Sequence, residues 1–78
     1  MKVADRIEVD PNICHGKPRI AGTRIPVETI LGLLADGLTP KEIIAKCYPD
    51  LPEEGILACI RYAKQLVEEE EVHAVPEV

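Results

Sequence analysis

The alternation of apolar and polar residues near the start of the chain predicts short strands. The stretch "RIEV" (6–9) places its two apolar residues on one side and its two charged residues on the other, and this period of two is typical of a strand. The "DPN" that follows ends the pattern. Further along, "RIAGTRI" repeats Arg-Ile around Gly22, which can supply the positive φ of a tight turn. We expect a small hairpin or loop there.

The next segments carry helical signals with clear ends. The first predicted helix begins near Pro26, which suits a helix start, and ends at Gly37, which fits a left-handed stop. The second begins at a capping box, in which Thr39 is the N-cap, Pro40 the first helical residue and Glu42 the residue that reaches back. The predicted buried sides of these helices are Val27, Ile30, Leu31 and Leu34 in the first and Ile43, Ile44 and Cys47 in the second.

The second helix ends at Tyr48, because Pro49 disfavours helical geometry in the residue before it. A third helix runs from about Pro52 to about Glu69. Its predicted core stripe is Ile56, Cys59, Ile60, Ala63 and Val67.

Two short joins between these helices force sharp reversals of the chain, which suits a bundle. We therefore predict a mostly α-helical fold, a homeodomain-like three-helix bundle of helix-turn-helix type with a short-stranded N-terminal arm. The arm covers residues 1–26, the bundle 27–70 and a flexible tail 71–78, all within a single domain.

The chain is short and poor in aromatic residues. It has 78 residues, no Trp, no Phe and two Tyr, so its core must be built from Ile, Leu and Val. A lone core of this size is marginal, and we expect a homodimer in which a second subunit adds burial. The sequence shows neither a membrane-spanning run nor the apolar run of a signal peptide, so we expect a cytoplasmic protein without membrane contact.

The sequence favours neither catalysis nor metal binding. The three cysteines form no CxxC pair, Cys14 and His15 are adjacent rather than spaced for chelation, and His73 lies in the tail. We expect Cys47 and Cys59 in the core and Cys14 packed within the arm. No nucleophile–base order or pair of acids in an apolar setting is evident. We predict a non-enzymatic protein without cofactor or metal.

Charge is distributed unevenly along the chain. Residues 1–27 hold five bases and three acids, a net +2, whereas residues 28–78 hold four bases and eleven acids, a net −7. A protein that clamps nucleic acid over its whole surface would not have this balance. A small basic patch for one partner and an acidic face for another would explain it.

The segment "GKPRIAGTRIPV" (16–27) concentrates bases and turn residues. Its bases Lys17, Arg19 and Arg24 are candidates for contact with phosphates or with a partner's carboxylates. Alternatively, these bases are solvated around a turn, with Thr23 bonding the turn backbone and Arg24 pairing with an acid of the helices. The residues expected to shape turns and caps are Gly16, Pro18, Gly22, Thr23, Pro26, Gly37, Thr39 and Pro40.

The third helix offers two further candidate surfaces. As a recognition helix it would place Glu53 and Glu54 of its first turn against DNA, and two acids are poorly suited to contacting base edges between phosphates. Arg61 and Lys64 follow later in the helix as candidate nucleic-acid or partner contacts. Its end is acidic, and this end either keeps the protein soluble or orders on a basic partner. The acids concerned are Glu68, Glu69, Glu70 and Glu71.

Four motifs together resemble one known family. They are "DPNICHGKP", "GTRIPV", "GLTPKEI" and the "YPDL" before the last helix, within a stretch from about Ile7 to about Ala63. The chain resembles the family catalogued as domain of unknown function 433. That resemblance implies a homeodomain-like trihelical fold and an antitoxin paired with a toxin of PIN-like nuclease type.

The chain departs from the family pattern at two positions. His15 stands where the family usually has Gly, so we expect a less strained turn here. Leu51 stands where Thr or Ser is common, and Leu is a poor N-cap, so the start of the third helix is expected to shift by a residue unless Asp50 caps it.

These observations favour an antitoxin-like protein that binds and neutralises a partner toxin, a PIN-like ribonuclease in the reading that the resemblance implies. Its acidic C-terminal half would meet the toxin, and its arm would pair two subunits through "RIEV" or "RIPV". Two alternatives stay open. One is a DNA-binding helix-turn-helix autoregulator that binds promoter DNA, and the other is a small dimeric interaction module.

Overall fold

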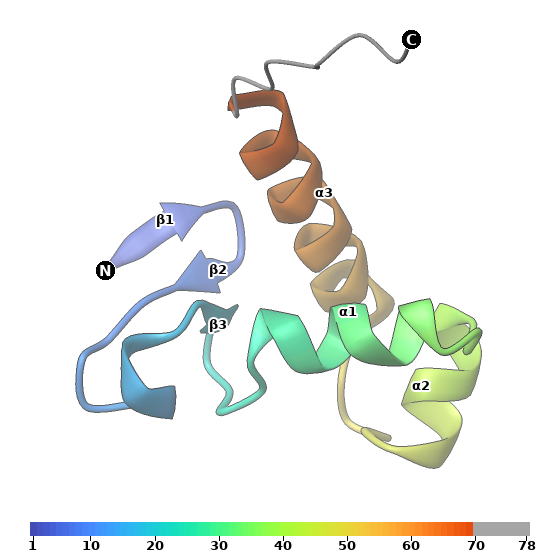
Figure 1. Ribbon diagram of the computed structural model, residues 1–78. Helices are drawn as coiled ribbons and strands as arrows, with labels where there is room; N and C mark the ends of the chain where they lie inside the picture. The colour runs from blue at the N-terminus through green and yellow to red at the C-terminus, as the bar shows by residue number, and fades with distance from the viewer. Residues whose placement is uncertain (70–78) are drawn as a thin grey trace, which may run out of the picture.

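A computed structural model describes residues 1–69 of the chain (Figure 1). The elements, in order, are β1 (Lys2–Ala4), β2 (Ile7–Glu8), a 3-10 turn (Cys14–Gly16), β3 (Arg19–Ile20), α1 (Val27–Ala35), α2 (Pro40–Lys46) and α3 (Glu53–Glu69). The prediction of a mostly helical fold with a short-stranded N-terminal segment is confirmed. The predicted tail, residues 71–78, lies outside the described residues, as does residue 70.

The three strands form a small antiparallel sheet in the order β1-β2-β3. In the register, Ile7 of β2 is opposite Ile20 of β3, and Glu8 is opposite Arg19. The predicted strand at "RIEV" is therefore real, whereas β1 was not predicted. Because β2 is paired on both sides, the "RIEV" segment has no free edge for pairing with a second subunit in this structure.

Local sequence signals fix the helix ends. The capping box is present: the Glu42 backbone N–H donates to Thr39 Oγ1 at 3.1 Å, and the Thr39 N–H donates to Glu42 Oε1 at 3.0 Å. The hydrogen bond from the Thr39 backbone, aided by Lys46, lowers the pKa of the Glu42 carboxyl. Gly37 has φ +97° after α1, which is the predicted left-handed stop.

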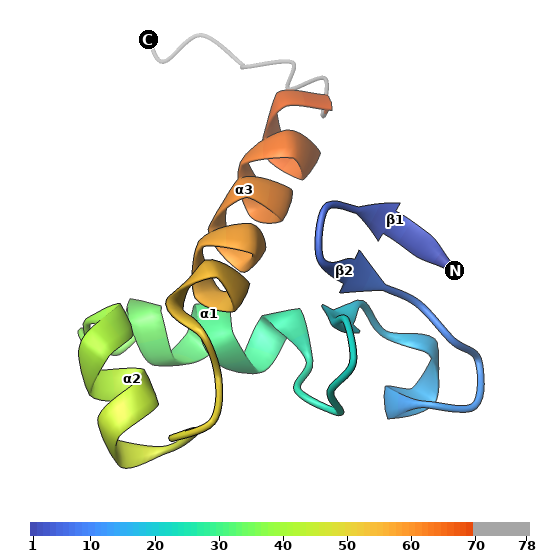
Figure 2. The same cartoon turned by 180° about the vertical axis from the view of Figure 1, so that it is seen from behind.

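The core joins the N-terminal segment to the helices. Ile7 and Ile20 come from the sheet, and the remaining members come from the helices and the turn before α3. The buried apolar residues are Ile7, Ile20, Val27, Ile30, Ile43, Leu51, Ile56, Ala58 and Cys59. Leu51, expected only as a poor cap, is thus a core residue. The sheet and α2 lie on opposite sides of the molecule, with α1 and the start of α3 between them (Figures 1 and 2).

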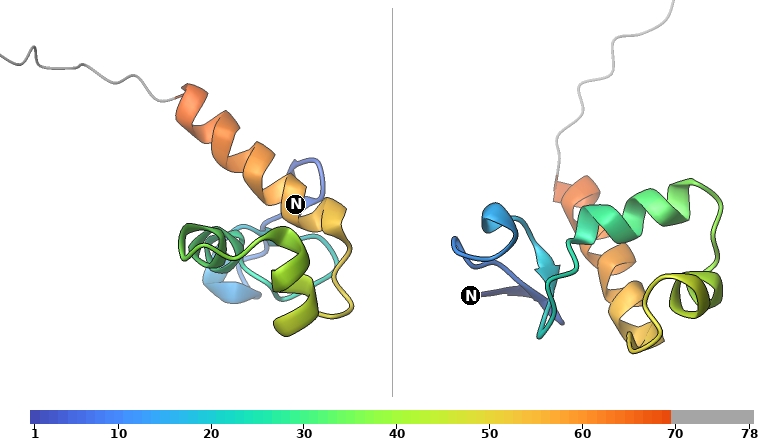
Figure 3. Two further views of the ribbon diagram at one scale, coloured as in Figure 1. Left: turned by 90° about the vertical axis from the view of Figure 1, so that its right-hand side faces the viewer. Right: turned by 90° about the horizontal axis from the view of Figure 1, so that it is seen from below.

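Helix α3 extends beyond the packed body of the protein (Figure 3). Its first turns bury Gly55, Ile56, Ala58 and Cys59. The prediction that the whole stripe is core is wrong at two positions, because Ile60 is 40% and Val67 66% exposed. The sheet and the other helices cover one side of the first half of α3, and these residues lie outside that contact.

The 3-10 turn has a left-handed backbone. Cys14, His15 and Gly16 have φ values of +54°, +55° and +77°. The expectation of a less strained turn at His15 is therefore wrong, since the backbone takes the left-handed conformation there although the residue carries a Cβ. Two backbone hydrogen bonds hold the turn: Gly16 N–H donates to Ile13 O at 3.1 Å, and Lys17 N–H donates to Cys14 O at 3.0 Å.

The strain at His15 leads to a stability prediction. His15 is exposed, so His15→Gly removes the left-handed penalty without removing a core contact. We expect the free energy of unfolding to rise by about 0.5–1 kcal/mol, the steric relief less the greater unfolded-state entropy of glycine. His15→Ala keeps a Cβ and is the control. Urea unfolding of the three proteins checks this, and an equal effect of Ala and Gly would contradict it.

Candidate binding surfaces

Most of the predicted basic contact residues are engaged by acids of the same chain. Of the five candidates, only Arg24 takes part in none of the ion pairs found within residues 1–69. The pairs are Lys17–Glu28 at 2.6 Å, Arg19–Glu8 at 3.1 Å, Arg61–Glu54 at 3.4 Å and Lys64–Glu68 at 2.8 Å. The structure therefore distributes these bases over four different acids.

Arg19 corrects the expectation of a surface patch in residues 16–27. Only 8% of Arg19 is exposed, and its Nη1 donates to Glu8 Oε1 at 3.1 Å across the β2–β3 pair. The same Glu8 oxygen accepts a hydrogen bond from the Gly22 N–H at 3.2 Å. Arg19 is therefore part of the internal structure, because cross-strand pairing places it beside an acid that also holds the following turn.

The Arg19–Glu8 pair is costly to break. Arg19 Nε is buried and makes no hydrogen bond within the described residues, so Nη1 is the guanidinium atom through which Glu8 compensates the buried charge. Removing one partner of a buried pair leaves the other charge without compensation. Because Glu8 also accepts from the Gly22 N–H, the pair holds the turn at Gly22 against strand β2.

The turn around Thr23 follows the alternative in which Thr23 bonds the turn backbone, whereas Arg24 takes part in no ion pair within residues 1–69. Thr23 Oγ1 donates to Ile20 O at 2.7 Å and accepts from the Ile25 N–H at 3.0 Å. Gly22 has φ +75°, the predicted positive value. Cys14 is half-buried, and its Sγ donates to Arg24 O at 3.2 Å, which ties the 3-10 turn to the segment before α1. The side chain of Arg24 is left exposed by this arrangement.

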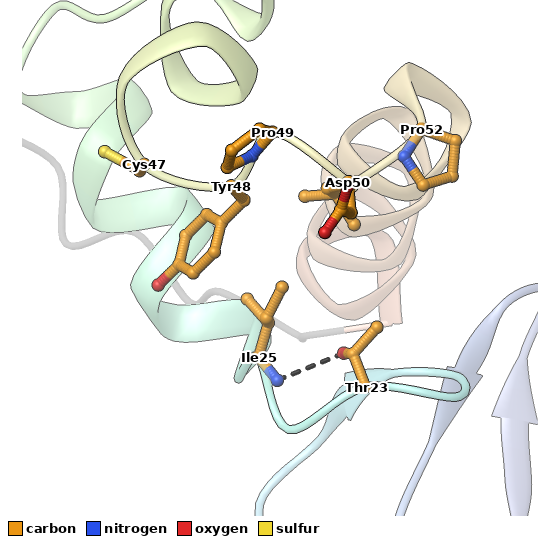
Figure 4. A pocket seen from close by; sticks show the side chains of 8 residues that line it. Thr23, Ile25, Cys47, Tyr48, Pro49, Asp50 and Pro52 are labelled. Atoms are coloured by element: carbon orange, nitrogen blue, oxygen red, sulfur yellow. Dashed lines mark hydrogen bonds between the residues drawn. The ribbon is translucent and has the colours of Figure 1, made fainter.

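A shallow hollow of about 240 Å³, which we call the turn hollow, separates this turn from the α2–α3 connection (Figure 4). It lies between the predicted "GTRIPV" and "YPDL" motifs, which are far apart in sequence. Its lining consists of Thr23, Ile25, Cys47, Tyr48, Pro49, Asp50, Leu51 and Pro52. It combines apolar surface with one carboxylate, and this composition suits binding rather than proton transfer.

Two cysteines have opposite environments. Cys47 follows the last turn of α2 and is exposed, so the prediction that it lies in the core is wrong. Cys59 is buried as predicted, and burial raises the pKa of its thiol to about 11. Cys59 is therefore an apolar core residue at neutral pH.

A second and larger hollow, which we call the α1–α3 groove, has a volume of about 360 Å³. Its lining is mainly apolar and comes from α1, the outer half of α3 and the segment before β3. The lining residues are Pro18, Val27, Glu28, Leu31, Tyr62, Ala63, Leu66 and Val67. The groove was missed in the sequence because Val27, Leu31, Ala63 and Val67 were assigned to the core. Leu66, which was not, is 44% exposed beside them.

The predicted acidic end lies just beyond this groove. Glu68 and Glu69 are exposed at the end of α3, where Glu68 pairs with Lys64 and Glu69 accepts from Gln65 Nε2 at 3.2 Å. Glu70 and Glu71 lie outside the described residues. The described part of this end is therefore a helix terminus with two acids and one neutralising base.

Comparison with known proteins identifies the family. The model of the family described as protein of unknown function DUF433 matches residues 7–63. The chain belongs to this family. It is also similar to a DUF433 member protein from Anabaena variabilis, known from a crystal structure, at 38% sequence identity and a TM-score of 0.72. That similarity covers 82% of this chain and 62% of the other. No curated protein matches the sequence.

The residues matched by the DUF433 model include one of the two hollows completely and the other only in part. The turn hollow lies wholly within the matched residues, whereas Leu66 and Val67 of the α1–α3 groove lie beyond them.

Within residues 1–69 no group of three His, Cys, Asp or Glu side chains could hold a metal ion. In the same part of the chain no helix has the length and apolar character needed to cross a bilayer. His73, considered above as a ligand, lies outside the described residues.

The buried and exposed ion pairs predict different costs of charge removal. We expect Glu8→Gln to lower the free energy of unfolding by about 1–3 kcal/mol, because the buried Arg19 guanidinium loses its counter-charge while Glu8 itself is 35% exposed. Glu28→Gln removes the counter-charge of the exposed Lys17 and should cost less than about 1 kcal/mol. Chemical denaturation of both variants at pH 7 measures the difference. Equal losses would show that Arg19 does not depend on Glu8.

Proposed function

We propose that this DUF433 protein is a non-enzymatic, antitoxin-like protein that binds and neutralises a partner toxin, a PIN-like ribonuclease. The observation that carries the proposal is the pairing of its bases with its own acids. Lys17, Arg19, Arg61 and Lys64 are each within 3.4 Å of a carboxylate of the same chain. These four bases therefore offer little free positive charge for phosphates, whereas the exposed Arg24 takes part in none of the ion pairs within residues 1–69.

The charge balance supports a basic protein partner. The chain has a net charge of −5, and residues 39–69, which contain α2 and α3, hold four bases against six acids. A ribonuclease needs a positive groove to hold RNA, so an acidic protein surface is complementary to that groove. Binding there would exclude RNA both sterically and electrostatically.

The end of α3 is the part of the described chain best suited to this role. Glu68 and Glu69 are exposed in the last described turn of α3. The helix extends from the body of the protein, so its end can reach into a concave surface (Figure 3). Lys64 compensates Glu68 in the free chain, and partner bases would compete for that carboxylate.

A DNA-binding autoregulator of the homeodomain-like helix-turn-helix type is the alternative that the same helices raise. Against it, the first turn of α3 carries Glu53 and Glu54, which would repel phosphates in a major groove. Arg61 is 3.4 Å from Glu54, so the base nearest to that turn is compensated. These contacts favour the toxin-binding proposal. An absence of gel shift with promoter DNA at low salt would exclude the regulator.

The proposal predicts complex formation with a PIN-like nuclease and loss of its RNA cleavage. We expect Glu68→Lys with Glu69→Lys to weaken inhibition by about tenfold or more, because both changes reverse charge against a basic groove. Glu53→Lys with Glu54→Lys, at the other end of α3, is the control and should change inhibition by less than about threefold. The measurement is RNA cleavage by the nuclease titrated with each variant. If the wild-type chain neither binds the nuclease nor slows cleavage, the proposal is wrong.

A further inference from the structure

The α1–α3 groove leaves apolar surface exposed in a small protein whose core is built from aliphatic residues. Leu66 is 44% and Val67 66% exposed, although the core contains no Phe or Trp and depends on aliphatic residues. Tyr62, Ala63, Leu66 and Val67 line the side of the groove formed by α3, opposite Val27 and Leu31 of α1. A contiguous apolar hollow of this kind is typical of a protein-binding site.

Acids border this groove on both helices. Glu28 is in the first turn of α1 and lines the groove, with 63% of its side chain exposed. Glu69 follows Leu66 by three residues on α3, so the two side chains lie on the same side of the helix. Lys17 is 2.6 Å from the Glu28 carboxylate, so these two charges compensate each other. Glu69 takes part in none of the ion pairs found within residues 1–69, and it gives this border its uncompensated negative charge.

This border discriminates between candidate occupants. A second copy of the chain would bring the same acids against the groove, and each copy has a net charge of −5. Like charges brought together at an interface oppose association. An apolar segment with lysine or arginine beside it would instead bury Leu66 and Val67, place a cation near Glu69 and compete with Lys17 for Glu28.

We propose that the α1–α3 groove binds a segment of a partner protein in which apolar side chains are flanked by lysine or arginine. This inference rests on the proposed function, since it names the chemistry of the toxin surface that the helix end would meet. The apolar contact supplies binding energy, and the acids at the border select a basic segment.

A synthetic helical peptide built only of leucine and lysine tests the groove directly, with a leucine–glutamate peptide as its counterpart. We expect the lysine peptide to bind, with amide chemical shift changes at Leu31, Tyr62 and Leu66, and the glutamate peptide to bind about tenfold more weakly or not at all. Leu66→Ser should weaken binding of the lysine peptide by about tenfold, because it removes buried apolar surface.

Ile60→Ser is the matched control. Ile60 is 40% exposed on the same helix, close to the value for Leu66, but does not line the groove. We expect this change to alter the affinity by less than about twofold. Thermal unfolding by circular dichroism verifies that both variants are folded, as expected for exposed positions. Equal weakening by the two changes, or shift changes confined to other faces, would overturn the proposal.

Two further measurements separate this inference from the proposed function. If the PIN-like nuclease binds the wild-type chain and Leu66→Ser equally well, the groove proposal fails while the antitoxin proposal stands. If the lysine peptide occupies the groove but no nuclease binds, the groove proposal stands and the antitoxin proposal fails. A wild-type dimer in sedimentation that Leu66→Ser dissociates and Ile60→Ser does not would overturn the groove proposal in favour of a second copy.

Discussion

The close approach of β3 and the α2–α3 connection to helix α3 at Gly55 is the contact on which the rest of the structure depends. A Cβ at Gly55 would lie 3.1 Å from Leu51 Cδ1 and 3.4 Å from Ile20 Cγ2, so glycine lets both side chains pack directly on the helix backbone. This contact brings Ile7 and Ile20 into one core with Ile56 and Cys59. Since the chain has no Phe or Trp, that shared aliphatic core replaces the aromatic mass that a small domain often uses.

The same contact determines where charge and apolar surface end up. With β3 against α3, Arg19 is enclosed beside Glu8, and a base that the sequence offers for binding becomes internal. The buried residues of α3 all lie in its first half, whereas Leu66 and Val67 in its outer half are exposed beside α1, and the α1–α3 groove remains open. The burial of Arg19 and the exposure of the apolar face beside Glu28 and Glu69 thus both follow from how the sheet and α1 pack on α3.

The features predicted correctly from the sequence are those that local interactions determine. The capping box at Thr39, the stop at Gly37 and the hydrogen bonds of Thr23 each depend on residues within a few positions, and each was predicted. The predictions that were wrong concern features determined by contacts between distant segments. The burial of Arg19 requires Glu8 from another strand, and the exposure of Val67 follows from which elements reach α3. Helical periodicity shows that a stripe is apolar but not how far along the helix another element covers it.

The candidate surfaces follow the same division. The bases and acids were visible in the sequence, but their pairing was not, and it is the pairing that shifts the balance from nucleic acid to a basic protein. Both hollows combine residues more than twenty positions apart, Thr23 with Asp50 in one and Leu31 with Leu66 in the other. Periodicity and composition carry no information on which distant residues come together in space.

Two glycine-to-alanine changes measure the close approach at Gly55 most directly. Gly32 in α1 has open space around a built Cβ, so Gly32→Ala should raise the free energy of unfolding by about 0.5–1 kcal/mol through helix propensity alone. Gly55→Ala brings a similar gain in propensity but presses on the buried Leu51 and Ile20, and we expect a net loss of about 1 kcal/mol or more in chemical denaturation. A rise for Gly55→Ala equal to that for Gly32→Ala would contradict the account.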